Sequence, residues 1–386
     1  MHIAFLTPEF PHAKTTNSGG LGTSIKNLVE SLVKADIQVT VFVYGQKNHE
    51  IIKESNLEIH LIKNKKYKFF GWFFHRKHIE QYCNSIIKKK GIDLIEAPDW
   101  TGITAFMKFK IPLVIRFHGS DTYFCHLENR KQKIKNFWFE KLATKGAKAF
   151  IAPTSFAGEV SKKLFKIEHK EIATIHYGLS LSNFENDNPK EFEKNLILYI
   201  GTIIRKKGVL ALPEIFNKVR IEVPDAKLVL IGVDSFDIKT NSNSTWELMK
   251  DLFNQQDLKQ VDYLGKIPYE EVQKYIRKAN ICVFPTFAET LGMVTIESMA
   301  MQKAVVNSNI GWAQELIVDQ ESGFLVHPSN HDDFSNRIIQ LLQSDLLCQE
   351  IGKKARTRVE AKFDINTLVH ENIEFYKKII NPNKSQ

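Results

Sequence analysis

The sequence is short of cysteine and of long apolar runs, and each shortage excludes a class of protein. Its 386 residues include only four cysteines, at positions 83, 125, 282 and 348, and none of them stands in a CxxC pair. That spacing supports neither a disulfide framework nor a zinc site, and it fits a reducing compartment. No stretch approaches the roughly 18 to 20 apolar residues that are needed to span a bilayer.

A secretory leader and a metal-binding acidic pair are also missing. The N-terminus, MHIAFLTPEF, has no cationic leader, and Pro8 and Glu9 break its apolar run. This pattern predicts a first β-strand rather than a signal peptide, and we expect a cytoplasmic protein. No DxD-like acidic pair follows any of the predicted strands, so nothing in the sequence points to a bound metal ion.

The remaining composition, 43% hydrophobic and 25% charged, is that of a globular chain long enough for about two domains. Near-continuous apolar runs alternate with helical patterns on both sides of a polar stretch at 182–195, which indicates parallel sheets covered on both faces. We predict an α/β fold with two Rossmann-like, doubly wound domains, 1–188 and 189–364, and a C-terminal helix, 365–386, that crosses back onto the first. The predicted strands are IAFLT, VTVFVY, LEIHLI, DLIEAP, PLVIRFH, AFIAPT, IATIHYG, LILYIG, AKLVLIG, VDYLG, ICVFP, AVVNS and GFLVHP.

Positive charge is spread unevenly over this chain, whose net charge is +9. The stretch 63–77, KNKKYKFFGWFFHRK, mixes cations with six aromatic rings and contains no acid, and a second basic stretch spans 129–141. Such a mixture suits an anionic membrane surface, where each cation contributes ~1 kcal/mol and aromatic rings settle among the headgroups. A solvated basic face or a nucleic-acid surface would use the same charges, although no RNP, helix-turn-helix or zinc-finger pattern accompanies them.

Each half of the chain opens with a loop that suits an anion. In the first half, Gly19-Gly20-Leu21-Gly22 precedes an amphipathic helix, and glycines let backbone N–H groups approach a ligand at a helix N-terminus. In the second half, YIGTIIRKKG ends a strand at Gly201 and then offers Arg205, Lys206 and Lys207, a candidate diphosphate clamp. A tight turn without a ligand and a solvated basic turn are the structural alternatives.

Three more side chains fall at predicted strand ends or helix starts. His118 ends a first-domain strand in LVIRFHGSD, where it can contact a substrate, although a satisfied core histidine gives the same pattern. Glu289 and Glu297 flank the turn in FAETLGMVTIES, between a buried strand and a helix that should begin near Met293. Open α/β sheets bind ligands at that edge, whereas helix capping is the simpler role for the two acids.

The order of these motifs is similar to that of a known family. GGLG, FHGSD, GTIIRKKG, the E-x7-E block PTFAETLGMVTIESMAMQKAVV and ESGFLVHP together resemble the retaining glycosyltransferases of family 4, glycosyl transferases group 1, which have the GT-B fold. The resemblance covers nearly the whole chain. It implies that two Rossmann-like domains face a central cleft, with the acceptor side in the first and the nucleotide-sugar donor in the second.

The resemblance also assigns the cations of the second half. It implies that Lys207 and either Arg205 or Lys206 neutralise the diphosphate of the donor. Many relatives carry arginine directly after the strand-end glycine, where this chain has Thr202, so the second cation must come from one of its neighbours.

The remaining roles concern the sugar and the nucleoside. The resemblance implies that Glu297 holds the ribose, that Glu289 hydrogen-bonds hydroxyls of the donor sugar, and that His118 lies beside the transferring sugar. We predict His118 and Glu289 as the catalytic residues. The other predicted donor-binding residues are Gly19, Gly20, Ile267, Thr290, Leu291, Gly292 and Met293.

The implied activity is transfer of a sugar from a nucleotide-diphosphate sugar to a saccharide or lipid-linked acceptor, in cell-surface polysaccharide or lipopolysaccharide biosynthesis. The resemblance favours front-face attack with retention, no metal and no cofactor, while a covalent glycosyl-enzyme stays open. Expected partners are the nucleotide sugar, the acceptor and the inner face of the plasma membrane, with no nucleic acid. A nucleotide-sugar epimerase of the same fold and a non-enzymatic sugar or nucleic-acid binder are the alternatives. A dinucleotide oxidoreductase fits poorly, because GGLG is not GxGxxG.

Overall fold

The chain folds into two compact units. The structure, a computed structural model, describes residues 1–15 and 19–382. The first unit comprises Met1–Gly178 and Ile365–Gln386, and the second comprises Leu179–Asp364. The change from the first unit to the second therefore falls at residue 178, where the sequence pattern placed it at residue 188.

The first unit is built on an eight-stranded sheet in the order β3-β4-β2-β1-β5-β6-β7-β8. Neighbouring strands are parallel throughout, except that β3 pairs antiparallel with β4. Parallel neighbours need long crossover connections, which most of the helices of this unit supply. The strands are β1 (His2–Thr7), β2 (Gln38–Gln46), β3 (Glu50–Glu54), β4 (Leu57–Lys63), β5 (Leu94–Pro98), β6 (Leu113–Arg116), β7 (Ala149–Ala152) and β8 (Ile172–Thr174).

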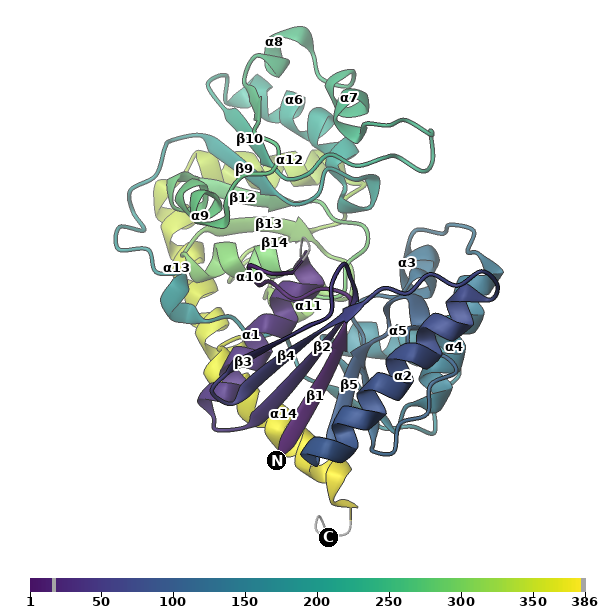
Figure 1. The fold of residues 1–386 in the computed structure, drawn as a ribbon. Helices are drawn as coiled ribbons and strands as arrows, with labels where there is room; N and C mark the ends of the chain where they lie inside the picture. The colour runs from purple at the N-terminus through teal and green to yellow at the C-terminus, as the bar shows by residue number, and fades with distance from the viewer. Residues whose placement is uncertain (16–18, 383–386) are drawn as a thin grey trace. The chain divides into compact units, whose positions relative to one another are not determined.

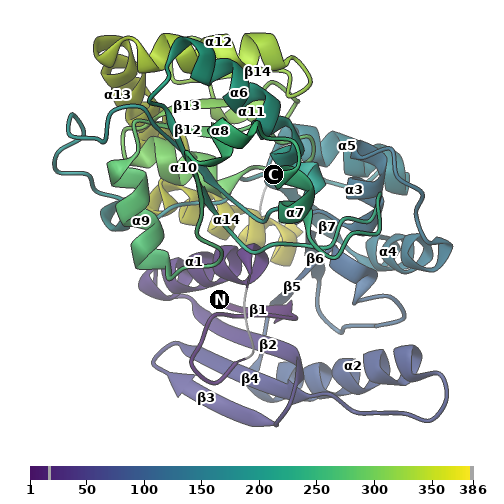
Figure 2. The same ribbon diagram turned by 90° about the horizontal axis from the view of Figure 1, so that it is seen from above.

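Helices cover both faces of this sheet, and each face has its own apolar core. Helices α1 and α14 pack on one face, and α2 packs on the other (Figure 2). Alternate residues of β7 show the division, because Ile151 belongs to the first core and Phe150 to the second. The helices of the unit are α1 (Gly20–Lys34), α2 (Gly71–Lys90), α3 (Asp121–Leu127), α4 (Ile134–Gly146), α5 (Ser155–Phe165) and α14 (Ile365–Ile380), with 3₁₀ turn η1 (Trp100–Gly102).

The C-terminal helix α14 is part of the first unit although it follows the whole of the second in sequence. It packs beside α1, and its buried apolar side chains join the core formed by α1, β1 and β2. The residues that make this contact are Leu368, Val369, Ile373, Phe375, Tyr376 and Ile379.

The second unit is built on a six-stranded sheet in the order β11-β10-β9-β12-β13-β14, with all neighbours parallel. Helices α6 and α12 lie on one side of its strands and α10 lies on the other (Figure 1). The strands are β9 (Leu196–Ile200), β10 (Lys227–Ile231), β11 (Val261–Tyr263), β12 (Ile281–Phe284), β13 (Ala304–Ser308) and β14 (Phe324–Val326).

Helices and 3₁₀ turns connect these parallel strands and flank them. They are η2 (Leu181–Asn183), η3 (Arg205–Lys207), η4 (Val209–Ala211), α6 (Leu212–Glu222), α7 (Thr245–Lys250), α8 (Gln255–Leu258), α9 (Tyr269–Lys278), α10 (Met293–Ala300), α11 (Ala313–Leu316), α12 (His331–Leu342) and α13 (Asp345–Lys362). Across residues 1–15 and 19–382, no helix is both long enough and apolar enough to cross a bilayer.

All thirteen apolar runs identified in the sequence form strands, which confirms the predicted α/β class. The run pattern missed β3, because its sequence EIIKE is mostly polar. This strand is an exposed, antiparallel edge that needs no continuous apolar run.

Candidate functional site

The basic turn of the second unit lies at the carboxyl edge of its sheet. Strand β9 ends at Ile200, and η3 carries the three cations. Backbone N–H groups of Phe287 and Ala288, which follow the neighbouring strand β12, donate to the Lys206 carbonyl oxygen at 2.9 and 3.2 Å. The basic turn and the E-x7-E loop are therefore fastened together at adjacent strand ends.

Gly208, directly after the basic turn, makes this close approach feasible. Its φ is +73°, and a Cβ atom built on it would stand 1.7 Å from the carbonyl oxygen of Pro285. Any side chain there would push the basic turn away from the strand end, so the position requires glycine.

Lys207 and Glu289 form an ion pair at this edge, through Lys207 Nζ and Glu289 Oε2. Both side chains are partly exposed, at 21% and 18%. Burial acts to raise the pKa of Glu289, but the Lys207 ammonium outweighs it and, with help from Lys206, holds that pKa below its usual value. Glu289 is therefore an anion held beside two cations, and a lysine ammonium has further donors for a second acceptor.

Arg205 points to a different partner. Its Nε and Nη2 atoms both donate at 2.8 Å to the carboxylate of Asp237, which is buried. The hydrogen bond from Arg205 lowers the pKa of Asp237 to about 2. This bidentate pair fixes the arginine, whereas Lys207 pairs with Glu289 and the charge of Lys206 also acts on that carboxylate.

Glu297 lies on α10 and is buried, with Tyr269 as its partner. The hydroxyl of Tyr269, the first residue of α9, donates to Glu297 Oε1 at 2.7 Å. Burial raises the pKa of Glu297 to about 7, and the tyrosine hydrogen bond opposes only part of that shift. Ile267 is half-buried two residues before Tyr269, in the loop that precedes α9. Sequence reasoning missed Tyr269, since no pattern marks a tyrosine at a helix start as the partner of a distant acid.

The segment between the two glutamates is a tight turn into α10. Gly292 is the N-cap residue with a φ of +100°, and α10 begins at Met293 as predicted. The Thr290 N–H group donates to Oε1 of Glu289 at 3.0 Å, and both Thr290 and Leu291 are buried. The turn thus places backbone groups and Glu289 together ahead of the helix.

In the first unit, His118 follows β6 and is half-buried against Tyr177. The two rings stack with centroids 5.3 Å apart and planes 13° apart. The Tyr177 hydroxyl lies 2.8 Å from His118 Nδ1 and donates to the carbonyl oxygen of Phe117 at 3.2 Å. Burial, with a smaller effect from the Arg116 charge, lowers the pKa of His118 to about 3, so the imidazole is neutral near pH 7.

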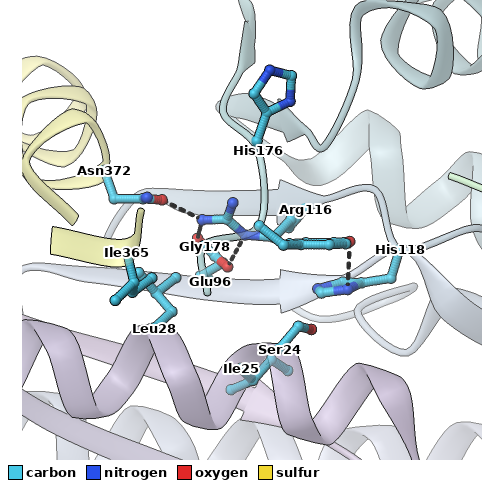
Figure 3. A pocket seen from close by; sticks show the side chains of 11 residues that line it. Ser24, Ile25, Leu28, Glu96, Arg116, His118, His176, Gly178, Ile365 and Asn372 are labelled. Carbon is cyan, nitrogen blue, oxygen red and sulfur yellow. Dashed lines mark hydrogen bonds and ion pairs between the residues drawn. The ribbon is translucent and has the colours of Figure 1, made fainter. Parts of the chain in front are cut away.

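Near His118, a buried network ties β5 and β6 to α14 (Figure 3). Arg116 donates through Nε to Glu96 at 2.7 Å and through Nη2 to Asn372 at 2.6 Å. The Tyr376 hydroxyl donates to the same carboxylate at 2.6 Å. Burial acts to lower the pKa of Arg116, but the Glu96 charge outweighs it and raises that pKa above its usual value. A cavity of about 10 Å³ beside the network has room for roughly one water molecule.

The glycine loop of the first unit differs from its prediction. Gly20 to Gly22 already belong to α1, and Gly19 is the N-cap residue. The Glu9 carboxylate accepts from the N–H groups of Gly19 and Gly22 at 2.8 and 2.9 Å. The chain itself therefore supplies an anion at this helix N-terminus, a contact that sequence reasoning missed because the acid lies ten residues earlier.

A pocket of about 400 Å³ opens beside these groups within the first unit. It combines a carboxylate, an imidazole and two aromatic rings, a mixture that suits a hydroxyl-rich ligand. Its lining residues are Pro8, Glu9, Leu21, Trp100, His118, Gly119 and Phe124.

The structure gives no candidate metal site. Within residues 1–15 and 19–382, no group of three or more histidine, cysteine, aspartate or glutamate side chains is arranged to hold a metal ion. All four cysteines are free and buried.

Family models match both halves of the sequence. The model described as Glycosyl transferases group 1 matches residues 182–358, and the model described as Glycosyltransferase Family 4 matches residues 18–183. An uncharacterized glycosyltransferase of Methanocaldococcus jannaschii is 24% identical over 88% of this chain and 89% of its own. The capsular polysaccharide biosynthesis glycosyltransferase CapM of Staphylococcus aureus is 28% identical over 51% of each chain.

Solved structures agree on the fold. Sucrose-phosphate synthase of Thermosynechococcus elongatus superposes with a TM-score of 0.82 at 21% identity, covering 99% of this chain and 100% of its own. The Anabaena protein HepE, solved in complex with UDP-glucose, superposes with a TM-score of 0.69 at 16% identity, covering 97% of this chain and 100% of its own. At these identities the likeness extends to the fold alone.

Proposed function

Because the chain belongs to the group 1, family 4 glycosyltransferases and has their GT-B fold, we propose that it transfers a sugar from a nucleotide-diphosphate sugar to a saccharide or lipid-linked acceptor. The observation that carries the proposal is the Lys207–Glu289 pair at the carboxyl edge of the second sheet. It holds a cation for a diphosphate next to a carboxylate for sugar hydroxyls, at the edge where open α/β sheets bind ligands. UDP-glucose bound to HepE, a protein of the same fold, supports a donor of this class.

In the second unit, Lys207 and Lys206 neutralise the diphosphate. The pairing of Arg205 with Asp237 favours Lys206 as the second cation, because a bidentate, buried carboxylate competes strongly for the arginine. As the sugar–phosphate bond breaks, negative charge grows on the departing phosphate, and fixed cations stabilise that charge. Glu289 holds hydroxyls of the donor sugar next to the same lysine.

Glu297 accepts hydrogen bonds from the ribose hydroxyls of the donor. A buried acid with its pKa near 7 ionises readily when hydroxyl donors approach, since hydrogen bonds to a carboxylate favour its charged form. Ile267, near Tyr269, packs against the nucleoside. The turn Thr290 to Met293 supplies backbone N–H groups to sugar and phosphate.

In the first unit, the pocket beside Glu9 and His118 binds the acceptor. The Tyr177 hydroxyl has one hydrogen, which it donates to Phe117, so it accepts from His118 Nδ1–H. That hydrogen bond fixes the tautomer of the neutral imidazole and leaves Nε2 as an acceptor for a substrate hydroxyl. Trp100 offers an exposed ring for the apolar face of a sugar.

Transfer proceeds with retention, by front-face attack, and without a metal ion or cofactor. The leaving phosphate takes the proton of the acceptor hydroxyl, and lysine ammonium groups supply the positive charge that a metal would otherwise bring. We assign Glu289, whose carboxylate is paired with Lys207 and the Thr290 N–H group, to hydrogen bonding with the sugar rather than to nucleophilic attack. Mass spectrometry of the protein after incubation with donor should find no glycosyl adduct.

The pathway we propose is cell-surface polysaccharide or lipopolysaccharide synthesis at the inner face of the plasma membrane. The likeness to CapM over half of each chain supports a polysaccharide product. The basic stretch 63–77 supports a lipid-linked acceptor, because it would keep the protein at an anionic surface.

The deciding experiment is a panel of nucleotide sugars incubated with the purified protein, with release of nucleotide diphosphate as the readout. One donor should turn over, and NMR of the glycoside formed on a simple alcohol or sugar acceptor should give the same anomeric configuration as the donor. Activity should persist in EDTA.

Other outcomes would assign another function. Conversion of the donor to an isomeric nucleotide sugar, with no acceptor present, would indicate an epimerase. Donor binding without turnover across the panel would indicate a sugar-binding protein. An inverted product, or a loss of activity in EDTA that added metal restores, would overturn the proposed mechanism while leaving a transferase.

A further inference from the structure

Two basic, aromatic stretches that lie far apart in sequence meet on the surface of the first unit. The first leads into α2, and the second forms the start of α4. Their aromatic rings touch, since the Trp72 and Phe139 centroids are 5.2 Å apart. Phe106 joins them, with centroids 5.5 Å from Trp72 and 6.0 Å from Phe139. Residues 63–77 and 129–141 therefore form one surface, called here the basic-aromatic patch.

Large apolar side chains protrude from this patch. Phe69 and Phe70 are 70% and 68% exposed, and Ile134 and Trp138 are 76% and 53% exposed. Phe70 has a φ of +49° as the N-cap residue of α2, an uncommon backbone conformation for a bulky residue. Clustered exposed apolar groups of this size mark an interaction surface on a soluble domain.

Lysines surround these apolar side chains. Exposed lysines come from both stretches, and none of them forms an ion pair with a residue that the structure describes. Arg76, counted with the cations in sequence, is instead buried, with its guanidinium 4.4 Å from the Phe139 ring centroid. Glu140, the acid in the second stretch, is also buried. The exposed lysines are Lys63, Lys65, Lys66, Lys68, Lys131, Lys133 and Lys135.

We propose that the basic-aromatic patch docks the first unit onto an anionic lipid bilayer, with Phe69, Phe70, Ile134 and Trp138 inserted among the headgroups and the lysines against lipid phosphates. The inference rests on the proposed location of the enzyme and adds the second stretch, α4, as half of the contact. Lipid fits the mixture of side chains because apolar groups enter the acyl boundary while cations stay in the headgroup layer. Nucleic acid fits it less well, since an exposed isoleucine offers no ring on which a base can stack.

The test is sedimentation of the full-length protein with vesicles in the absence of any nucleotide sugar. Vesicles of phosphatidylcholine with 30% phosphatidylglycerol, a composition chosen for the assay, should bind the protein, and pure phosphatidylcholine should bind it far more weakly. Binding should weaken as salt increases, because counterions screen the lysines. Equal binding to both kinds of vesicle would overturn the proposal.

Paired substitutions separate the two stretches. Lys65→Ser with Lys66→Ser, and Lys131→Ser with Lys133→Ser, should each lower the vesicle partition coefficient by about tenfold or more. The matched control, Lys88→Ser with Lys89→Ser, changes exposed lysines at the far end of α2 and should leave partitioning nearly unchanged. An effect of the first pair with none of the second would overturn the single-patch proposal.

Phe69→Ser with Ile134→Ser tests insertion. This pair should weaken vesicle binding even at high salt, and tryptophan fluorescence from the wild-type protein should shift to the blue with anionic vesicles. A homopolymeric RNA that competes fully with the vesicles would assign the patch to nucleic acid instead.

Release of nucleotide diphosphate with a soluble acceptor is the separate readout, because the lysine variants should lose vesicle binding and keep this activity. If the wild-type protein transfers sugar but does not bind anionic vesicles, the docking proposal is wrong and the proposed function stands.

Discussion

Each sheet of this protein carries an ion pair that joins neighbouring strands or the loops that follow them, and the two pairs differ in burial. In the first unit, Arg116 and Glu96 have side chains that are 3% and 2% exposed, and Asn372 and Tyr376 add hydrogen bonds. In the second unit, Lys207 and its partner Glu289 remain about one-fifth exposed. A basic group beside a glutamate therefore appears once as a buried structural ion pair and once as a partly exposed pair at the edge of a sheet.

The difference teaches what turns an ion pair into a candidate site. A deeply buried pair is closed to all but the smallest ligand, and removing one partner leaves a buried charge. A partly exposed lysine keeps donors for a second anion and can exchange water for substrate. The comparison predicts that damage to the Arg116–Glu96 pair appears in stability, and that damage to the Lys207–Glu289 pair appears in turnover.

Lys207→Met should give the largest loss of activity. With the cation gone, the departing diphosphate loses its main stabilisation, so kcat/KM should fall by about 10³-fold, or ~4 kcal/mol. The measurement is release of nucleotide diphosphate with donor varied. Lys227→Met, at the opposite end of a strand in the same sheet, is the control and should keep normal rates. A Lys207 variant with normal turnover would remove the basis of the proposed function.

Glu96→Gln should instead cost stability. Removing the charge partner of a buried arginine should lower the free energy of unfolding by about 3 kcal/mol, which urea denaturation would measure. Glu171→Gln is the matched control, because it breaks an exposed ion pair with Lys378 of α14. This variant should lower the free energy of unfolding by less than ~1 kcal/mol. Equal losses from the two variants would mean that burial does not set the difference.

Substitutions of Glu289 and Glu297 should change different kinetic constants. Glu289→Gln should chiefly lower kcat, on the order of 10²-fold, if the carboxylate strengthens a hydrogen bond to the sugar in the transition state. Glu297→Ala should chiefly raise the donor KM, since the ribose is held alike in ground and transition states. If the two acids only cap the helix, both variants should keep normal kinetics. Their free energy of unfolding should fall by roughly 0.3 to 1 kcal/mol, which slightly lowers the melting temperature.

The donor KM should depend on pH through Glu297. Burial raises its pKa from 4.5 to about 7, so the carboxylate that accepts ribose hydroxyls becomes protonated as pH falls below 7. The KM should therefore rise by up to about tenfold per pH unit below 7 and level off above it. Glu297→Gln should flatten this profile between pH 5 and 8. An unchanged profile in that variant would assign the dependence to another group.

Tyr177→Phe should have the smallest effect of the set. The phenyl ring keeps the stacking with His118 but loses the hydroxyl that fixes its tautomer, so kcat should fall about fivefold, or ~1 kcal/mol. Nitrogen NMR of labelled histidine should show hydrogen at Nδ1 of His118 in the wild-type protein and a mixture of tautomers in the variant. A wild-type spectrum with hydrogen at Nε2 would contradict the proposed orientation.

Sequence reasoning succeeded where the signal is local. Apolar runs located thirteen strands, and the apolar positions Val294, Ile296 and Met299 located the start of α10 near Met293. These features depend on neighbours a few residues away, because strand and helix periodicity are properties of short segments. The charged motifs were found in the same way, by their position after a strand.

Partners of the charged residues were beyond such reasoning. Arg205 was grouped with the diphosphate clamp, yet its carboxylate partner Asp237 stands 32 positions later. Tyr269 is separated from Glu297 by 28 positions. Each pairing depends on how loops of different strands fold over one edge, and no local pattern records that geometry.

By itself, the sequence determined which segments become strands and helices, and therefore that charged loops gather at the carboxyl edges of parallel sheets. Only the tertiary structure decided which of those charges remain accessible. Glu9 bonds to the N–H groups of Gly19 and Gly22, and Asn372 on α14 reaches Arg116 across 256 positions of sequence. The physical reason is that secondary structure follows short-range periodicity, whereas the environment of a charge depends on every segment that packs around it.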